Sequence, residues 1–527
     1  MITNPFQRRA ETLTIRIAAA LSANQRLHPN HISNGDEARY AKGLGNFTKG
    51  LEHNPLTGEV QDPAHLRLFV KALNEGQFGL LDSLPPVPGV ARQRKFVNPQ
   101  SGLAFDLEGP DAQAVTMPPA PTLDSAQEAG EAVELYWMAR LRDVAFTDYA
   151  TDATAAAAIS DLKALSDFRG PRDPASGQVT AGTLFRGGTR SDRVGPYLSQ
   201  FLLLDIPISA LMCEQRQQPA APGWDYMTTW SDWLDVQNGE ETSGTDTFDS
   251  TRRYIRNGRD LATYVHFDRL YEPYLNACLI LLSGGTAFDA GNPYHDSPRQ
   301  AGFVSFGGAH LLALVGEVTT RALKAMWFQK WFVHRQLRPE AYGGWVERNR
   351  TSPGSYPLHS DVTNSAAVAA TISATGTALL PQAFPEGSPL HPSYGAGHAI
   401  VAAACVTVLK AWFDESFAMS QLRVAGEPGK PGTPLGAPRV PDAAGTALTS
   451  YTGPGSNQLT VGDELNKLAS NIAIGRNHAG VHWYSDYIHS MRLGEEIAID
   501  LLKEQQPTYR EKASFSLTRF DGTVISI

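Results

Sequence analysis

The most informative stretch of this chain is Arg476-Asn477-His478-Ala479-Gly480-Val481-His482, followed four residues later by Asp486. A histidine and an aspartate four positions apart share one face of a helix, so the carboxylate, or a neighbouring backbone carbonyl, can accept the Nδ1 proton of His482 and leave a lone pair on Nε2. Arg476, beyond the break at Gly480, is expected to offer its planar guanidinium to an anion beside that lone pair. Taken alone, the pattern also fits a helix-surface His–Asp pair with a structural arginine.

A second motif lies upstream, where Lys330 is followed by Arg338-Pro339. Proline disfavours helical backbone at the residue before it, so a helix predicted over about 308–336 should end near Leu337. A frayed helix end and two long side chains would let both cationic groups converge on one anion. Taken alone, Lys330 and Arg338 fit two solvated charges on a helix end better than an anion site, because lone pairs of Lys and Arg are common.

A third motif is Gly395-Ala396-Gly397-His398, which opens an apolar run. The glycines predict a close-approaching backbone, and the amides at the start of the following helix, including that of Gly397, would face an anion. His398 on the first turn would stand beside that anion as a proton donor or acceptor. The alternative is a glycine-rich turn before a core helix.

Together the motifs supply three cations, a glycine amide and two imidazoles. Lysine and arginine keep their protons near neutral pH and are not ordinary metal ligands. The set therefore suits a compact tetrahedral oxyanion, phosphate or vanadate, better than a metal cation.

Composition and charge exclude several classes of protein. The chain has 527 residues, enough for two or three domains or one large helical body, and its formal net charge is −9. No long run of Lys or Arg occurs, so we expect neither a nucleic-acid partner nor a membrane partner. The best apolar run, 399–409, is too short to span a bilayer. The N-terminus lacks the pattern of a signal peptide, so a soluble, by default cytoplasmic, protein is expected.

The periodicity of apolar residues is helical throughout. Apolar residues recur at intervals of three and four over 128–145, 259–283, 308–336, 398–413, 461–474 and 484–504. The end of the chain, 515–527, predicts a small hairpin around Asp521-Gly522. We expect an N-terminal helical half over 1–240 and a C-terminal half over 241–527 that carries the motifs. Cys213, Cys278 and Cys405 lie in apolar, helix-like segments and are expected to be buried free thiols.

In this order, the three motifs resemble the signatures of the vanadium-dependent haloperoxidases, a superfamily shared with type 2 phosphatidic acid phosphatases and bacterial class A acid phosphatases. The stretches 45–53, 306–310, 327–335 and 475–486 are similar to the algal and cyanobacterial bromoperoxidase branch, so the resemblance covers most of the chain. It implies an all-α fold of two helical bundles of the vanadium haloperoxidase and acid phosphatase type, with minor β-hairpins. A homodimer or larger homo-oligomer is implied by the algal branch.

The resemblance also implies a role for each motif residue. His482 would bond vanadium as the metal ligand, Asp486 would orient His482, and His398 would be the acid–base that assists peroxide binding. The oxygens of vanadate would be held by the remaining members of the set: Lys330, Arg338, Arg476 and the Gly397 amide.

Two positions depart from, or distinguish within, the family pattern. Ala396 stands where the family usually has a serine whose hydroxyl contacts an oxygen of the cofactor, and losing one hydrogen bond to a charged group weakens binding by roughly 1–3 kcal/mol, about 5- to 150-fold. His391 matches a histidine of the algal type, where the fungal chloroperoxidase type has an aromatic ring. We take it as a hypothesis that His391 favours bromide and iodide over chloride; a loop histidine before Pro392 is the alternative.

The expected enzyme is a vanadium-dependent haloperoxidase. It would oxidise bromide or iodide, and chloride less readily, with hydrogen peroxide to a hypohalous-acid equivalent that halogenates a small organic nucleophile. Phosphate fits the same pocket, so an acid phosphatase in which His482 attacks phosphorus is an alternative. A second alternative is a non-catalytic scaffold in which Ala396 marks the loss of vanadate.

Overall fold

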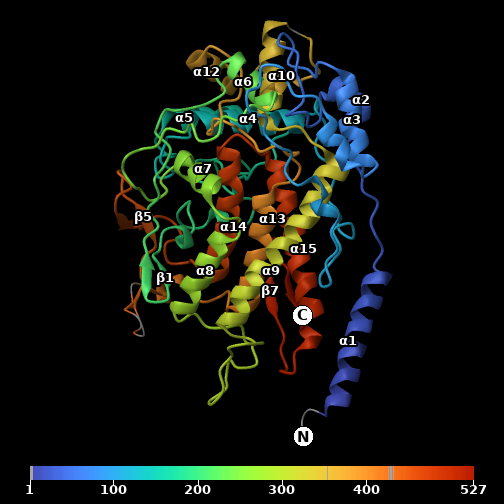
Figure 1. Ribbon diagram of the computed structural model, residues 1–527. Helices are drawn as coiled ribbons and strands as arrows, with labels where there is room; N and C mark the ends of the chain where they lie inside the picture. The colour runs from blue at the N-terminus through green and yellow to red at the C-terminus, as the bar shows by residue number, and fades with distance from the viewer. Residues whose placement is uncertain (1–3, 353, 425, 428–429, 431) are drawn as a thin grey trace.

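The fold is built from helices, with strands only at its edges (Figure 1). The computed structural model describes residues 4–352, 354–424, 426–427, 430 and 432–527. Its α-helices are α1 (Pro5–Gln25), α2 (Asp36–Arg39), α3 (Pro63–Asn74), α4 (Ala126–Arg140), α5 (Ala153–Ala164), α6 (Trp230–Gln237), α7 (Gly258–Phe267), α8 (Glu272–Ser283), α9 (Gly308–Phe328), α10 (Pro339–Thr351), α11 (Ser360–Thr363), α12 (Ala366–Thr375), α13 (Gly397–Trp412), α14 (Val461–His478) and α15 (Tyr484–Gln505).

Within the described residues the strands form four two-stranded antiparallel hairpins. They pair β1 (Ile206–Ile208) with β2 (Leu211–Cys213), β3 (Arg423–Val424) with β4 (Thr433–Pro434), β5 (Arg439–Pro441) with β6 (Leu448–Ser450), and β7 (Ser516–Thr518) with β8 (Val524–Ser526). The last pair confirms the hairpin predicted around Asp521-Gly522. The all-α prediction with minor hairpins is confirmed as well.

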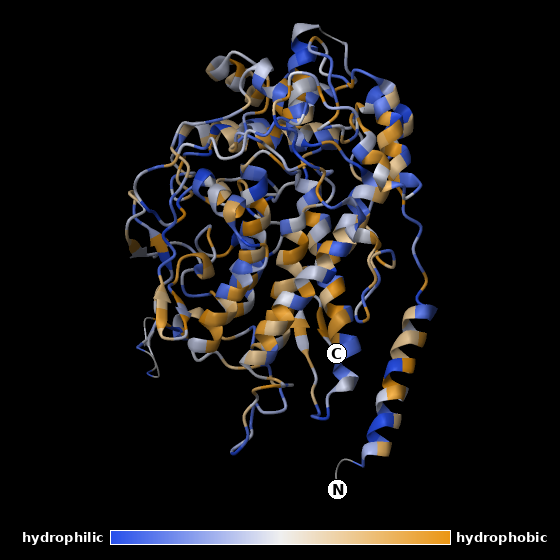
Figure 2. Ribbon diagram, viewed as in Figure 1, coloured by the Kyte–Doolittle hydropathy of each residue, from blue (hydrophilic) through white to orange (hydrophobic). Residues whose placement is uncertain are grey.

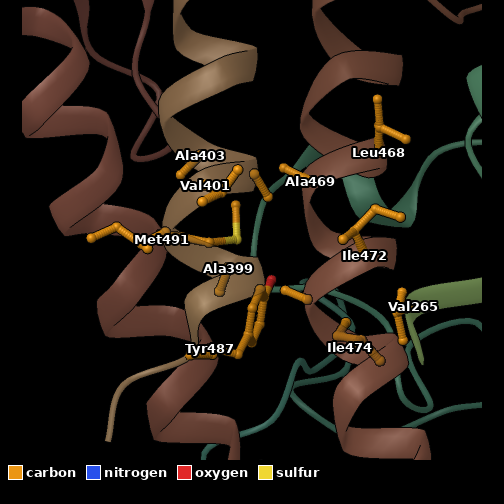
Figure 3. Packing of buried hydrophobic residues seen from close by; sticks show 14 of the residues in the cluster. Val265, Ala399, Val401, Ala403, Leu468, Ala469, Ile472, Ile474, Tyr487 and Met491 are labelled. Carbon is orange, nitrogen blue, oxygen red and sulfur yellow. The ribbon is translucent and has the colours of Figure 1, made fainter. Parts of the chain in front are cut away.

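The centre of the molecule is α13, which packs against α9, α14 and α15. Nearly all of its residues are buried, because small side chains such as Ala402, Ala403 and Ala404 let the neighbouring helices approach closely. Figure 3 shows Ala399, Val401 and Ala403 of α13 facing apolar side chains of α14 and α15, including Ile472 and Met491. Burying each larger side chain contributes about 1.5–3 kcal/mol.

Two central helices begin where the sequence supplies a capping side chain. The Thr460 hydroxyl accepts from the amide of Asp463 at the start of α14. At the start of α15 the Asp486 carboxylate accepts from the amide of Trp483. These caps satisfy amides that have no partner inside the helix, and the second one also fixes Asp486 near the motifs.

Several predicted boundaries were wrong in detail. The periodic stretch 259–283 is two helices, α7 and α8, because the chain turns at Asp268–Tyr271. The helix expected to end near Leu337 is α-helical only to Phe328 and continues as a π-helical segment, Gln329–His334. Cys213 lies in strand β2 and is half-buried rather than helical and buried, whereas Cys278 and Cys405 are buried free thiols as predicted.

The N-terminal helix α1 stands apart from the body (Figure 1), and Figure 2 shows apolar and polar residues alternating along it. Its residues are exposed over the whole length. In the part of the chain that the structure describes, no helix is both long enough and apolar enough to cross a bilayer. The division into residues 1–240 and 241–527 stays a prediction.

Candidate active site

Lys330 and Arg338 reach the same short segment of chain from two directions. Lys330 lies in the π-helical segment, fully buried, and its Nζ donates to the carbonyl oxygens of Pro392 and Ser393, both at 2.9 Å. Arg338 is the N-cap of α10 in extended backbone, as its position before Pro339 predicts. Its Nε donates to the carbonyl oxygen of His391 at 3.0 Å. The two cations therefore converge through the 391–393 segment.

His482 and Asp486 are in contact, but not because they share a helix face. His482 precedes α15, whereas Asp486 lies in its first turn, so the expected continuous helix is wrong. Gly480, with φ of +85°, turns the chain between α14 and α15. The predicted contact is nonetheless present: His482 Nδ1 lies 2.6 Å from Asp486 Oδ2.

The guanidinium of Arg338 lies against the other side of the His482 ring. Its Nη1 donates to the Val481 carbonyl at 2.8 Å and lies 3.0 Å from His482 Nε2. An arginine N–H can only donate, so Nε2 must accept and carries a lone pair, while the Nδ1 proton goes to Asp486. Nη2 of Arg338 lies 2.9 Å from His391 Nδ1, which joins His391 to the same group.

His398 and Arg476 meet at the C-terminal end of α7. His398 Nε2 lies 2.9 Å from Asp268 Oδ1. Arg476 donates from Nη1 to the Val265 carbonyl at 2.9 Å, and its guanidinium carbon lies 5.7 Å from the centre of the Phe384 ring. The C-terminal end of α7 and the residue after it therefore position both His398 and Arg476.

Glycine is needed at one of the two motif positions and not at the other. A Cβ at Gly395 would lie 2.2 Å from Ser490 Oγ, so the close approach predicted there is present. A Cβ at Gly397 would make only ordinary contacts, 3.5 Å from the Trp327 ring. Gly397 is the first residue of α13, as the sequence predicted within one position.

Burial and mutual repulsion govern the charges in the site. Burial, followed by Arg338, lowers the pKa of Lys330 well below its usual value. Burial also lowers the pKa of Arg338 to about 10, and lowers the pKa of Arg476. Burial and then the surrounding cations lower the pKa of His482 well below its ordinary value, so the imidazole is neutral.

The arrangement fits a tetrahedral oxyanion. Three buried cations gather around a neutral imidazole, and Nε of Arg476 has no hydrogen-bond partner among the described residues. The start of α10 is tied to the segment before α15 by the hydrogen bond from Arg338 to the Val481 carbonyl. The start of α13 is tied to α15 by the hydrogen bond from the Ala396 amide to Ser490 Oγ. Helix N-termini favour negative charge, and an anion there would offset the repulsion that Lys330 and Arg338 experience.

Three contributing residues were not found from the sequence. Asp268 contacts His398, and Ser393 donates from its hydroxyl to Asp486 Oδ2. Lys49 forms a buried ion pair with Glu340 at 2.8 Å and donates to the Ser388 carbonyl at 2.7 Å, which fixes the chain leading to His391. The stretch 45–53 resembled the bromoperoxidase branch, and that was the only signal for Lys49; Asp268 was hidden inside an apparently continuous helix.

Comparison with known proteins extends this likeness to the whole chain. A family model described as the VCPO second helical-bundle domain matches residues 310–510. A vanadium-dependent bromoperoxidase from Corallina pilulifera is 39% identical, and the match covers 97% of each chain. One from Ascophyllum nodosum is 34% identical over 100% of this chain and 93% of its own.

A solved structure agrees with these sequence matches. The homohexameric structure of the second vanadate-dependent bromoperoxidase, AnII, from Ascophyllum nodosum has a TM-score of 0.90 with 29% sequence identity. The match covers 100% of this chain and 91% of that one. The helical architecture is therefore shared from end to end, and this chain belongs to the family of vanadium-dependent bromoperoxidases.

Proposed function

We propose that this protein is a vanadate-dependent bromoperoxidase that uses hydrogen peroxide to oxidise bromide, and iodide, to a hypohalous-acid equivalent. That product would halogenate a small organic nucleophile. The observation that carries the proposal is a neutral His482 imidazole, held by Asp486 and surrounded by three buried cations, in a chain that matches bromoperoxidases over its full length. Bound vanadate would supply an electrophilic centre at which peroxide becomes reactive toward a halide.

His482 is the residue that would ligate vanadium through Nε2. Asp486 accepts the Nδ1 proton at 2.6 Å, which fixes the tautomer with its lone pair on Nε2. In addition to that bond, Asp486 Oδ2 accepts from the Ser393 hydroxyl and from the Trp483 amide. The carboxylate therefore cannot rotate away without losing several hydrogen bonds, and His482 stays oriented.

Lys330, Arg338, Arg476 and the Gly397 amide would hold the oxygens. Their positive charge would compensate the charge of the bound oxyanion and would make its oxygens easier to attack. Arg338 would shift its Nη1 from His482 Nε2 to an oxygen when the site is loaded. Phosphate has the same shape and charge class, so it should compete for the site.

His398 would move the proton that peroxide gives up on binding. Its Nε2 contacts Asp268, so Nδ1 is the nitrogen left for proton exchange. His391 lies against Arg338 and 4.9 Å from the Trp327 ring, ring centre to ring centre. From this place it would influence proton supply and halide preference, bromide over chloride.

The protein is also proposed to form a homo-oligomer. The support is the homohexameric bromoperoxidase AnII, whose structure this chain matches throughout.

The test is hydrogen-peroxide-dependent bromination of a phenol-type dye after loading the protein with orthovanadate, with hydrolysis of a phosphate ester measured on the same preparation. Bromination should require vanadate and should disappear in His482→Ala. His489→Ala removes a histidine from the same helix region outside the site and should retain the activity. Hydrolysis without bromination would indicate an acid phosphatase instead. If neither reaction is detected, a non-catalytic scaffold that does not bind vanadate would be the better account.

A further inference from the structure

A further histidine–carboxylate pair lies near the His398–Asp268 contact. His266 Nε2 lies 3.3 Å from Glu386 Oε1, and the side chain of Glu386 is only 7% exposed. Burial, and then the charge of Arg476, lower the pKa of His266 to about 3, so the ring is neutral and can donate a proton from Nε2 to the carboxylate. Neither His266 nor Glu386 belongs to the three sequence motifs.

The His266 ring also packs on the aromatic ring beside which Arg476 lies. The rings of His266 and Phe384 are stacked, with their centres 3.8 Å and their planes 16° apart. The guanidinium carbon of Arg476 lies 5.7 Å from the centre of the same Phe384 ring, within the range of a cation–π contact. His266 therefore contacts the 384–386 segment twice, through its ring and through Nε2.

The 384–386 segment is itself held in place by other parts of the chain. The Glu386 carbonyl accepts from Lys49 Nζ at 2.9 Å and from Arg94 Nη1 at 3.1 Å. Directly before the segment, the Ala383 amide donates to the carbonyl of Ala479, the residue that follows α14, at 3.1 Å. The segment is therefore a fixed support on which the end of α7 can rest.

The end of α7 carries contacts that position two residues of the site. The Val265 carbonyl, directly before His266, accepts from Arg476 Nη1 at 2.9 Å. Asp268, two residues after His266, lies 2.9 Å from His398 Nε2. Helix α7 packs against α14, which carries Arg476 (Figure 1). The last carbonyls of a helix have no partner within it, so the place of the Val265 carbonyl depends on what holds this helix end.

We propose that His266 is a positioning residue of the oxyanion site: its contacts with Phe384 and Glu386 fix the end of α7, and through it Arg476 and His398. A shift of this helix end would move the partner of Arg476 and the partner of His398 together. The inference rests on the proposed function, in which Arg476 holds an oxygen of vanadate and His398 carries a proton. The alternative is a histidine that only stabilises the fold.

The experiment measures the Kd of the full-length protein for orthovanadate, and for inorganic phosphate, by equilibrium dialysis. His266→Ala removes both contacts and should raise the Kd for vanadate about 10–100-fold, the usual cost of losing a residue that orients a ligand. In protein that already carries Arg476→Ala, the same change should add little, because the residue through which His266 acts is gone. His266→Gln keeps a donor that can reach Glu386 and should recover part of the affinity.

A second measurement follows His398. The pH profile of kcat for bromination should shift in His266→Ala, because Asp268 then loses its fixed position. The control is His359→Ala, which removes a half-buried histidine 3.6 Å from Asp361 at the start of α11. It should lower the free energy of unfolding in urea and leave both the Kd and the pH profile unchanged.

The remaining outcomes contradict the positioning role. An unchanged Kd in His266→Ala, or equal losses of affinity with and without Arg476, would show that His266 does not act through Arg476. An unchanged pH profile would remove the link to His398, and a His266→Gln variant as weak as His266→Ala would remove the role of Glu386. If His266→Ala does not fold, His266→Gln carries the same comparison with and without Arg476.

Failure of the proposed function gives a different result. Wild-type protein that binds vanadate without brominating would contradict the bromoperoxidase, while the comparison of Kd values would still decide the role of His266. Wild-type protein that binds neither vanadate nor phosphate would overturn both.

Discussion

Replacing Ala396 by serine should tighten the binding of vanadate. Ala396 is the N-cap of α13, is fully buried, and donates its amide proton to Ser490 Oγ at 2.9 Å. No side chain caps the start of α13, so a serine hydroxyl added there would not displace an existing cap. A new hydrogen bond to a charged oxyanion is worth roughly 1–3 kcal/mol, so the Kd for vanadate should fall about 5- to 150-fold.

A serine at this position has a competing use, which the assay must separate. As an N-cap it would accept from an amide of the first turn and add about 0.5–2 kcal/mol to the unfolding free energy without any anion. Equilibrium dialysis with vanadium analysis measures Kd directly, and urea unfolding of the vanadate-free protein measures the cap. Only the first quantity reports the bond to the oxyanion.

The control is Ala399→Ser, the same substitution one turn further along α13, where Figure 3 shows the side chain in the core. It should leave the Kd for vanadate unchanged. If Ala396→Ser folds normally and also binds vanadate with wild-type affinity, the side chain at position 396 does not face the oxyanion. The weaker binding inferred from the missing serine would then be wrong.

Two further changes test residues of the site, and a third tests a buried carboxyl group of α4. Asp268→Asn should weaken the contact that orients His398. The value of kcat should fall by up to about 10²–10⁴-fold, the range for one acid–base group, and the pH profile of kcat should shift, while vanadate still binds. An unchanged pH profile would contradict this role. His391→Ala should move the ratio of bromide to chloride turnover, and a constant ratio would remove its proposed role. Burial raises the pKa of Glu134 from 4.5 to about 8, so the folded state binds the proton more tightly and the free energy of unfolding falls as pH rises from about 4.5 to 8. Glu134→Gln should abolish the contribution of this group to that fall, a gain of at most about 5 kcal/mol at pH 8. Urea unfolding at pH 5 and pH 8 measures it, and an equal loss of unfolding free energy between the two pH values in both proteins would refute it.

The central helices follow from local sequence. In α13, α14 and α15 apolar residues recur with the helical period over more than three turns, and the starts of α14 and α15 carry capping side chains at Thr460 and Asp486. Such signals depend on residues a few positions apart, so they survive without knowledge of the rest of the fold. The break at Asp268 was missed because apolar residues continue on both sides of it.

The sequence by itself determined which residues make up the candidate site. The order and spacing of the three motifs also determined that the chain resembles the bromoperoxidases. Tertiary structure alone decided how those residues meet. His398 contacts Asp268, which lies 130 residues away, and Arg338 contacts His482 across 144. No local period encodes a separation of that size. Contacts of this kind exist because α7, α10, α13 and α15 pack around one core. Only that packing buries three cations so close together that a bound anion would relieve their mutual repulsion.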